Sequence, residues 1–276
     1  MGKSGNIDVK TVEGFGQEWS HFDQTEWDGA EHRGLFDKYF GDFPFPELRE
    51  AEGFDLGCGS GRWAALVAPQ VGKLHCIDAA RQALDVAQRR LDGVANVEFH
   101  LASVDQMPIA DGSQDFGYSL GVLHHTPDTQ GAMDACVRKL KKGAPFLVYL
   151  YYSFDNRPWW FRALWKSSDL LRLGISRLPF AVRRRTTTAI AALLYFPLAR
   201  TARALERRGV DVDGFPLSAY RDRTFYAMKT DALDRFGTRL EQRFSKREIA
   251  EMMERSGLRD IAFNDWGNWI AWGRKA

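Results

Sequence analysis

A glycine-rich turn in the sequence has the residue types and spacing of a site for a nucleotide-like ligand. Residues 54–63 read FDLGCGSGRW, an apolar run that ends in an acid and then meets a glycine at every second position. Glycines at such a turn let a ligand approach the main chain closely. The helix expected next opens with unpaired N–H groups, which favour polar or anionic ligand groups. The stretch therefore predicts a ligand site where a strand ends.

Side chains at the ends of further expected strands strengthen this prediction. Asp78 ends the second strand, where a carboxylate can accept hydrogen bonds from two ribose hydroxyls. Ser103-Val104-Asp105 ends the third, where a hydroxyl and a backbone N–H could read an adenine edge. Leu120 ends the fourth, at the ligand-facing edge of such a sheet. A loop cap is the alternative for Ser103 and Asp105, and a purely structural turn is the alternative for Gly57 and Gly59.

The spacing of the glycines separates this turn from the dinucleotide fingerprint. Gly57, Gly59 and Gly61 follow the pattern GxGxG, whereas the dinucleotide fingerprint is GxGxxG. Cys58, inside the turn, is expected to be a small packed residue rather than a nucleophile. Glycine turns are common, so the assignment depends on the strand ends as well as on the spacing.

Alternating strand and helix patterns surround these residues and predict a parallel sheet with helices on both faces. The strands are expected at residues 53–56, 73–78, 96–103, 115–120 and 145–152. The helices are expected at residues 61–68, 80–91 and 129–140. After a long interruption, a helix over residues 245–256 precedes two strands, 258–264 and 268–273, which the turn Asp265-Trp266-Gly267 joins into an antiparallel hairpin.

Four segments together resemble the class I S-adenosylmethionine-dependent methyltransferases, in particular the ubiquinone/menaquinone-biosynthesis-like group (methyltransferase type 11). They are FDLGCGSGRW (54–63), HCID (75–78), SVDQMPIADGSQDFGYSLGVLHHTPD (103–128) and FSKREIAEMMERSGL (244–258). The resemblance implies an α/β fold with a doubly wound, seven-stranded, mostly parallel sheet of Rossmann-like form and an antiparallel last strand. It also implies S-adenosylmethionine as the cofactor and S-adenosylhomocysteine as the product.

The same resemblance implies which residues hold the cofactor. Asp55 and the three glycines would cradle its methionine part, Asp78 its ribose, and Leu120 its methionyl end. Ser103 and Val104 would hold the adenine, with Asp105 as a substitute because many relatives carry an aspartate where Ser103 stands. The full predicted set is Asp55, Gly57, Cys58, Gly59, Gly61, Asp78, Ala79, Ser103, Val104, Asp105, Leu120 and Trp19.

Methyl transfer needs a general base only where the acceptor is still protonated, as a hydroxyl or an acidic C–H is. His124 and His125 directly follow the fourth strand, and only one of two adjacent residues is expected to face the cleft. The resemblance favours His125; capping the next helix or bonding Asp128 is the alternative for each histidine. Tyr152 and Trp19 are further candidates for the acceptor pocket, with plain packing as the alternative.

The composition limits which other partners, metals and cell compartments are expected. The net charge of +2 does not favour nucleic-acid binding. The three cysteines are widely spaced and show no metal-ligand spacing, so no metal is predicted and free thiols in a reducing compartment are expected. No run reaches the roughly 18–20 apolar residues of a membrane-spanning helix, and residues 1–10 do not resemble a secretion signal. We expect a cytoplasmic globular protein whose oligomeric state is open, a homodimer included.

Three segments are expected: residues 1–50 as an N-terminal cover, 51–152 with 245–276 as the cofactor-binding domain, and 153–244 as a helical insertion. In the cover, residues 12–22 are expected as a helix or loop and 34–40 as a helix. In the insertion, residues 157–208 hold eleven arginines and one lysine against two acidic residues, a local net charge of +10. Three interpretations stay open for it: a lid with a solvated basic face, a lid over an anionic or amphipathic acceptor, or a peripheral contact with an anionic inner membrane surface.

These inferences converge on methyl transfer from S-adenosylmethionine to a small or lipophilic molecule, on O, C or N, in biosynthesis. A non-catalytic S-adenosylmethionine-binding or scaffold protein stays open as an alternative, because fold alone does not establish activity. A nicotinamide-dependent reductase on a similar sheet is the other alternative, and the glycine spacing and the terminal hairpin argue against it.

Overall fold

The computed structural model describes residues 5–21, 29–155, 158–264 and 269–276, which form two compact units. Among these residues, the first unit runs to residue 158 and resumes at residue 240, and the second comprises residues 159–239. Each unit has its own hydrophobic interior.

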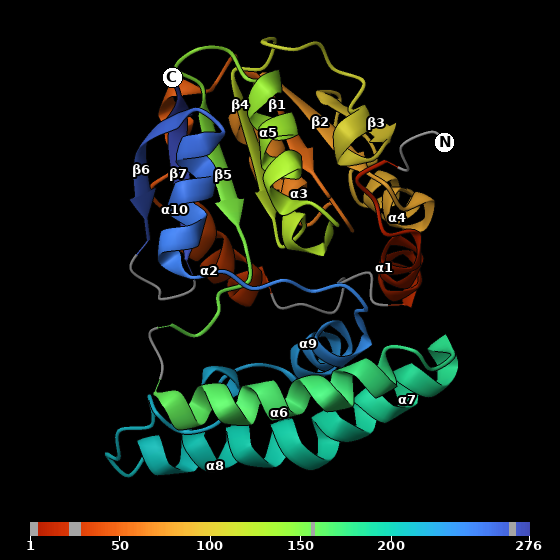
Figure 1. Cartoon of the computed structure of the whole chain (residues 1–276), viewed down its shortest axis with the longest axis vertical. Helices are drawn as coiled ribbons and strands as arrows, with labels where there is room; N and C mark the ends of the chain where they lie inside the picture. Colours follow the sequence, from red (N-terminus) through yellow and green to blue (C-terminus); the bar gives the residue numbers. More distant parts are fainter. Residues whose placement is uncertain (1–4, 22–28, 156–157, 265–268) are drawn as a thin grey trace. The chain divides into compact units, whose positions relative to one another are not determined.

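The first unit is built on a seven-stranded sheet in the order β3-β2-β1-β4-β5-β7-β6 (Figure 1). Neighbours among β1 to β5 pair in parallel, whereas β7 pairs antiparallel with both β5 and β6. The predicted fold class is therefore confirmed, including the antiparallel hairpin that closes the sheet; the turn predicted at residues 265–267 lies outside the described residues. The strands are β1 (Glu52–Leu56), β2 (Lys73–Asp78), β3 (Val97–Leu101), β4 (Phe116–Leu120), β5 (Pro145–Tyr149), β6 (Leu258–Phe263) and β7 (Ile270–Lys275).

The structure corrects the bounds of several predicted elements. The helix expected over residues 34–40 begins at Gly29, and the last strand runs to Lys275 rather than to residue 273. The helix expected from residue 61 begins only at Ala64, because Gly61 stays in the turn with a φ of +72°. β3 ends at Leu101, since the chain then turns into a short 3₁₀ segment, Val104–Gln106. β5 ends at Tyr149 rather than at residue 152.

Helices cover both faces of this sheet. α5 and α10 lie side by side against one face (Figure 1), where their buried side chains pack with Phe54 of β1. Because side chains alternate along a strand, Phe116 and Tyr118 of β4 point to the other face. There the Phe40 ring lies 5.2 Å from the Tyr118 ring, and the Phe43 ring lies 6.4 Å from the Phe116 ring. The helices of this unit are α1 (Val9–His21), α2 (Gly29–Phe40), α3 (Ala64–Val67), α4 (Arg81–Arg90), α5 (Thr129–Lys139) and α10 (Lys246–Arg255).

The two edge strands of the sheet are β3 and β6. In β6 the pairing with β7 shifts register between Arg259 and Ala262. Within this irregular stretch Asp260 has a φ of +54°. A bulge of this kind bends an edge strand and interrupts its ladder.

The second unit consists of helices, which include α6 (Trp159–Ile175), α7 (Phe180–Ile190), α8 (Phe196–Glu206) and α9 (Phe225–Gly237). A π-helical turn, Ala191–Tyr195, connects α7 to α8 just before Pro197. Proline has no N–H for a helical hydrogen bond, and the wider turn accommodates it. None of the helices in the described part of the chain is long and apolar enough to cross a membrane.

Some arginines of the basic stretch bind backbone carbonyls inside the second unit. Arg172 Nη1 donates to the carbonyls of Thr238 and Arg239, at 3.1 Å each. Arg183 Nη1 donates to the carbonyl of Gly237 at 3.1 Å. These carbonyls lie at the C-terminal end of α9, where the helix dipole favours cations. A solvated basic face therefore describes only part of this stretch.

Candidate ligand site at the strand ends

A cavity lies in the first unit at the carboxyl ends of the parallel strands, where ligands bind in open α/β sheets. It encloses about 810 Å³ of space when its open mouth is included. Its walls come from the N-terminal segment and from residues at or after the ends of β1 to β4. Eight residues predicted from the sequence line it: Trp19, Gly57, Asp78, Ala79, Ser103, Val104, Leu120 and His125.

The glycine turn has the backbone form that glycine permits. Gly57, Gly59 and Gly61 have φ values of +76°, +55° and +72°, a region that L side chains rarely adopt. The N–H groups of Gly57 and Cys58 donate to the Ile77 carbonyl at 2.7 and 3.1 Å. The turn is thereby fixed against the end of β2, directly beside Asp78.

The glycines of the turn also lack room for a side chain, as Gly57 and Gly59 show. A Cβ on Gly57 would lie 2.7 Å from Cγ1 of Val122 and closer still to Cγ2. A Cβ on Gly59 would lie 3.3 Å from the indole nitrogen of Trp19. Trp19, on α1, therefore packs directly on the turn, as an N-terminal cover of the site would.

Asp78 connects the turn to the end of β2. One carboxylate oxygen accepts the Gly59 N–H at 2.9 Å and the other accepts the Ala80 N–H at 2.8 Å. Burial raises the pKa of Asp78, and the backbone N–H donors partly offset that rise. A carboxylate has about four lone-pair sites, so Asp78 can still accept hydrogen bonds from a ligand in the cavity.

Asp55 does not line the cavity; it is buried in the sheet beside Tyr118. Burial raises the pKa of Asp55 to about 8, and the neighbouring Tyr118 hydroxyl offsets part of that rise. The carboxyl is therefore mostly protonated at neutral pH. In this state Asp55 can support the turn from within the sheet, and its predicted contact with a cofactor stays a prediction.

Three other predicted residues of the turn, Cys58, Gly59 and Gly61, also lie outside the cavity wall. Cys58 is buried, and a hydrogen bond with Cys76, together with burial, raises the pKa of its thiol well above the ordinary value. A thiol in this state is a poor nucleophile, which agrees with a packing role. A Cβ on Gly61 would lie 3.1 Å from Ala87, so this glycine permits close packing of the turn on α4.

The end of β3 brings a hydroxyl and a carboxylate together. Ser103 and Val104 line the cavity, whereas Asp105 is exposed and does not. The Ser103 hydroxyl donates to Asp105 Oδ1 at 2.7 Å. Ser103 is therefore the member of this pair that faces the cavity, and Asp105 orients its hydroxyl.

Of the two histidines after β4, His125 lines the cavity and His124 does not. His125 Nδ1 lies 2.7 Å from the Leu240 carbonyl oxygen. Because a carbonyl oxygen only accepts, Nδ1 carries the proton, and the neutral ring keeps its lone pair on Nε2. That tautomer suits a residue that accepts a proton through Nε2.

His124 is completely buried, and its ring centroid lies 3.9 Å from that of Tyr151 and 4.0 Å from that of His125. Within the described residues neither ring nitrogen has a hydrogen-bond partner. Burial, then the neighbouring His125 and Arg243, hold the pKa of His124 well below its usual value. His124 is thus a neutral packing partner that supports the His125 ring.

Tyr152 lies away from the cavity lining. Its ring packs on Phe154 at 4.5 Å and on Trp269 at 6.4 Å between centroids. The preceding residue, Tyr151, is the one beside the histidines, with Arg243 over its ring at 5.0 Å. The sequence alone could not decide which of these two adjacent tyrosines lies beside the histidines, because it did not fix the residue at which β5 ends.

The N-terminal residues close the cavity in a way that no local motif indicated. Asn6 holds them in place, since its side chain donates to the Asp128 carbonyl at 2.7 Å and accepts the Asp128 N–H at 2.9 Å. Phe15 places its ring 4.9 Å from that of His125. Thr11 also lines the cavity, and its buried hydroxyl has no hydrogen-bond partner among residues that the structure describes. A buried hydroxyl without a partner beside a cavity indicates a polar ligand group.

The cavity fits an S-adenosyl ligand by its chemistry. Asp78 and Ser103 offer acceptor oxygens for hydroxyls and for the amino group of a base, and Leu120 offers an apolar contact. Among the described residues the Thr11 hydroxyl has no partner and can serve a ligand. Gly57 exposes backbone without a side chain. Such a mixture of apolar walls and a few convergent polar groups is typical of cofactor sites.

Comparison with known proteins agrees with this chemistry. Residues 54–148 match the family described as "Methyltransferase domain". The chain is 29% identical over 177 residues to a ubiquinone/menaquinone biosynthesis C-methyltransferase of Rubrivivax gelatinosus, covering 62% of this chain and 65% of that protein. It is 30% identical over 105 residues to a ubiquinone biosynthesis O-methyltransferase of Thiobacillus denitrificans, covering 37% of this chain and 44% of that protein.

A solved structure shares the fold. It is an SAM-dependent methyltransferase of Thermotoga maritima, described as a possible histamine N-methyltransferase, with a TM-score of 0.51 and 14% identity. The match covers 95% of this chain and all of that one. At this identity the likeness concerns the fold alone, and it agrees with the class I sheet order and the antiparallel hairpin described above.

Proposed function

Because residues 54–148 carry a methyltransferase domain, we propose that this protein transfers a methyl group from S-adenosylmethionine to a small or lipophilic acceptor. The observation that carries the proposal is one cavity in which Gly57, Asp78, Ser103 and Leu120 meet His125. A cofactor site and a group that can accept a proton are thus adjacent. A sheet that only bound the cofactor would not require the second feature.

The proposed cofactor contacts follow from the chemistry of each wall. Asp78 would accept hydrogen bonds from the ribose hydroxyls, and Ser103 and Val104 would hold the adenine. Backbone of the Gly57 turn and the Leu120 end of β4 would hold the methionyl part. When bound, S-adenosylmethionine supplies an activated methyl group with a good leaving group. The protein's part is to align the acceptor with that methyl and to exclude water.

His125 is the proposed general base for an acceptor that is still protonated. Its Nδ1–H donates to the Leu240 carbonyl, which leaves Nε2 to accept the proton. His124 and Phe15 pack on its ring at 4.0 and 4.9 Å and hold its orientation. General bases contribute typically 10²–10⁴-fold to a rate.

A lipophilic acceptor is supported by the surface of α6 in the second unit. Trp159, Arg162, Lys166 and Leu170 recur at helical spacing and are all exposed, Trp159 by 75% and Leu170 by 72%. Basic residues mixed with tryptophan and leucine on one exposed helix face are typical of helices that lie on anionic membranes. The two relatives named above act in ubiquinone biosynthesis, and we infer for this chain a cytoplasmic location at the inner membrane surface.

Calorimetry and a transfer assay test the proposal. S-adenosylhomocysteine should bind to the purified chain, and NADH should not. A labelled methyl group should pass to members of a panel of lipophilic hydroxyl, amine and acidic C–H compounds. Binding without transfer to any compound would favour the non-catalytic alternative, and binding of NADH alone would favour the reductase.

His125→Gln tests the base. We expect turnover to fall about 10²–10⁴-fold while the Kd for S-adenosylhomocysteine changes less than about threefold. His21→Gln, at an exposed position of α1 outside the cavity lining, is the matched control and should keep full turnover. Full turnover in His125→Gln would show that His125 is not the general base.

Sedimentation with anionic vesicles tests the membrane contact. The chain should co-sediment at low salt and less so at high salt, because screening weakens attraction to the lipid charge. Trp159→Ala combined with Leu170→Ala should reduce binding. Leu193→Ala, which removes an equally exposed leucine (80%) outside α6, is the control.

A further inference from the structure

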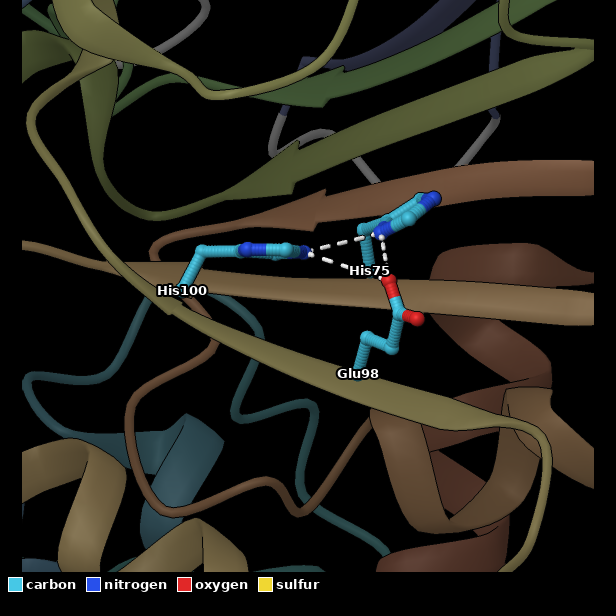
Figure 2. Close-up of side chains that lie close together, drawn as sticks. All are labelled: His75, Glu98 and His100. Atoms are coloured by element: carbon cyan, nitrogen blue, oxygen red, sulfur yellow. Dashed lines mark hydrogen bonds and ion pairs between the residues drawn. The ribbon is translucent and has the colours of Figure 1, made fainter.

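Two histidines and a glutamate meet on one face of the sheet, away from the cavity. His75 lies on β2, and Glu98 and His100 lie on the neighbouring edge strand β3. In the parallel register His75 is opposite Glu98, and Ile77 is opposite His100. Because side chains alternate along a strand, all three side chains project from the same face, and Figure 2 shows them turned toward one another.

The three ligand atoms are spaced as around one metal ion. His75 Nδ1 lies 2.9 Å from His100 Nε2 and 3.3 Å from Glu98 Oε2. His100 Nε2 lies 3.8 Å from Glu98 Oε2. Ligands bound at about 2.0–2.1 Å in a tetrahedral zinc site are about 3.3–3.4 Å apart. The three separations lie on both sides of this value, so shifts of about half an ångström would complete the triangle.

Glu52 on β1 sets His75 in the tautomer that a metal requires. His75 Nε2 lies 2.6 Å from Glu52 Oε1, and the His75 side chain is only 5% exposed. A carboxylate accepts, so Nε2 carries the proton and Nδ1 has a lone pair that faces Glu98 and His100. A carboxylate behind a histidine in this way is the usual outer partner of a metal-bound imidazole.

Lys73 pairs with one of these ligands, Glu98, in this structure. Its Nζ lies 3.1 Å from Glu98 Oε2 and 3.9 Å from Glu52 Oε1. Lys73 and Glu98 are both partly exposed, by 38% and 52%, so the lysine can swing into solvent when a cation replaces it. Such exposure also gives an ion a path into the site.

We propose that His75, Glu98 and His100 form a binding site for a divalent transition-metal ion, best matched by Zn²⁺. Two imidazoles and one carboxylate are the ligand set of zinc sites that keep a further position for water. On binding, His100 moves its Nε2 proton to Nδ1, and the Lys73 ammonium leaves Glu98. The ion would then join β2 to the edge strand β3 through side chains.

The position of the site suggests what it would do. His75 and His100 each lie three residues before a cavity residue, Asp78 on β2 and Ser103 after β3. At about 3.3 Å per residue, the site is roughly 10 Å from the cavity along both chains. A metal there would stiffen the two segments that carry Asp78 and Ser103 without touching a ligand in the cavity.

Metal titration of the full chain, without a histidine tag and after treatment with a chelator, tests the proposal. Co²⁺ should bind with one equivalent and give the visible absorption of a site with nitrogen and oxygen ligands. Zn²⁺ should displace it with one equivalent in calorimetry. His100→Ala and Glu98→Ala should each weaken Zn²⁺ binding at least 100-fold. Glu52→Gln should weaken it about 10–100-fold, as removal of an outer partner does.

Two control variants separate this site from adventitious binding. His21→Ala removes an exposed surface histidine and should leave the affinity unchanged. Lys73→Met removes the competing cation and should keep or tighten Zn²⁺ binding. If the cluster were only an ion-pair network, the same substitution would remove the cation that pairs its carboxylates. The circular dichroism spectrum of metal-free His100→Ala, with His100→Gln as a second variant, checks folding.

Two kinds of result would overturn the proposed metal site. Binding that persists in both His100 variants, or several weak equivalents that fall with His21→Ala, would show adventitious binding only. Absence of one-equivalent binding in the wild-type chain would remove the site. Both outcomes are independent of methyl transfer, since the titration needs neither cofactor nor acceptor.

Discussion

Gly57→Ala is the sharpest test of how the cofactor turn is built. Its backbone φ of +76° costs a non-glycine residue about 1–2 kcal/mol. The added methyl would also overlap the Val122 side chain, with Cγ1 at 2.7 Å, and overpacking typically costs about 1–3 kcal/mol. We therefore expect a total loss of about 2–5 kcal/mol.

Gly121→Ala is the matched control for this substitution. Gly121 also lines the cavity and has a φ of +78°, but a Cβ there would meet nothing within 4 Å. Only the backbone cost of about 1–2 kcal/mol applies. The difference between the two variants therefore measures the contact between Gly57 and Val122.

A double variant isolates that contact. In Gly57→Ala/Val122→Ala both Val122 methyl groups are gone and only its Cβ, at 3.0 Å, still meets the new side chain. The second substitution should therefore return part of the overpacking cost of about 1–3 kcal/mol. Amide hydrogen exchange of peptides from β1 and β4 gives the local opening free energy of this unit alone. Equal losses in Gly57→Ala and Gly121→Ala, with no rescue by Val122→Ala, would refute the reasoning.

Three other substitutions have expected outcomes. Because the pKa of Asp55 is raised to about 8, the unfolded chain binds fewer protons than the folded chain between about pH 4 and 8, so stability falls as pH rises through this window. Asp55→Asn should remove up to about 4 kcal/mol of that fall between pH 5 and pH 8, at about 1.4 kcal/mol per pH unit, measured by urea unfolding at the two pH values; an unchanged slope would contradict the burial argument. Asp78→Asn keeps one acceptor where two N–H groups donate, so the Kd for S-adenosylhomocysteine should rise at least about tenfold by calorimetry; an unchanged Kd would show that Asp78 serves the turn only. Ser245→Ala removes the capping box of α10 and should cost about 1 kcal/mol, seen as faster hydrogen exchange in the first turn of α10.

The sheet could be predicted from the sequence because its signals are local. Glycine turns, acids at strand ends and alternating apolar segments lie within a few residues of the elements that they mark. The helix predicted from residue 245 is such a case, since Ser245 caps α10 with a reciprocal bond to Glu248. Local signals were weaker at the ends of elements. Gly61, with its positive φ, still belongs to the turn, so the helix begins only at Ala64.

The parts of the site that depend on distant contacts could not be predicted in this way. Thr11 and Phe15 line the cavity, yet nothing near them in the sequence indicates a ligand; the many aromatic residues of the first 50 indicated only a cover. The choice between His124 and His125 depends on a carbonyl at Leu240, more than a hundred residues away.

The cluster of His75, Glu98 and His100 illustrates the same limit. No short-range metal spacing joins residues 23 positions apart, and only the register of β2 with β3 makes His75 and Glu98 neighbours. The sequence did contain a signal for this cluster. Glu98 and His100 alternate on one expected strand, and the neighbouring expected strand holds His75. Reading side-chain faces across predicted neighbouring strands would have found it.

The bulge in β6 has a consequence for self-assembly. An edge strand with regular, unpaired N–H and C=O groups can continue its sheet into a second molecule. In β6 the left-handed Asp260 and the register shift next to it break that row of groups, and the charged side chains of Arg259 and Asp260 are exposed. A homodimer that extended the sheet through β6 would have to repair the bulge and bury these charges. Any stable homodimer is therefore expected to use a surface other than this edge.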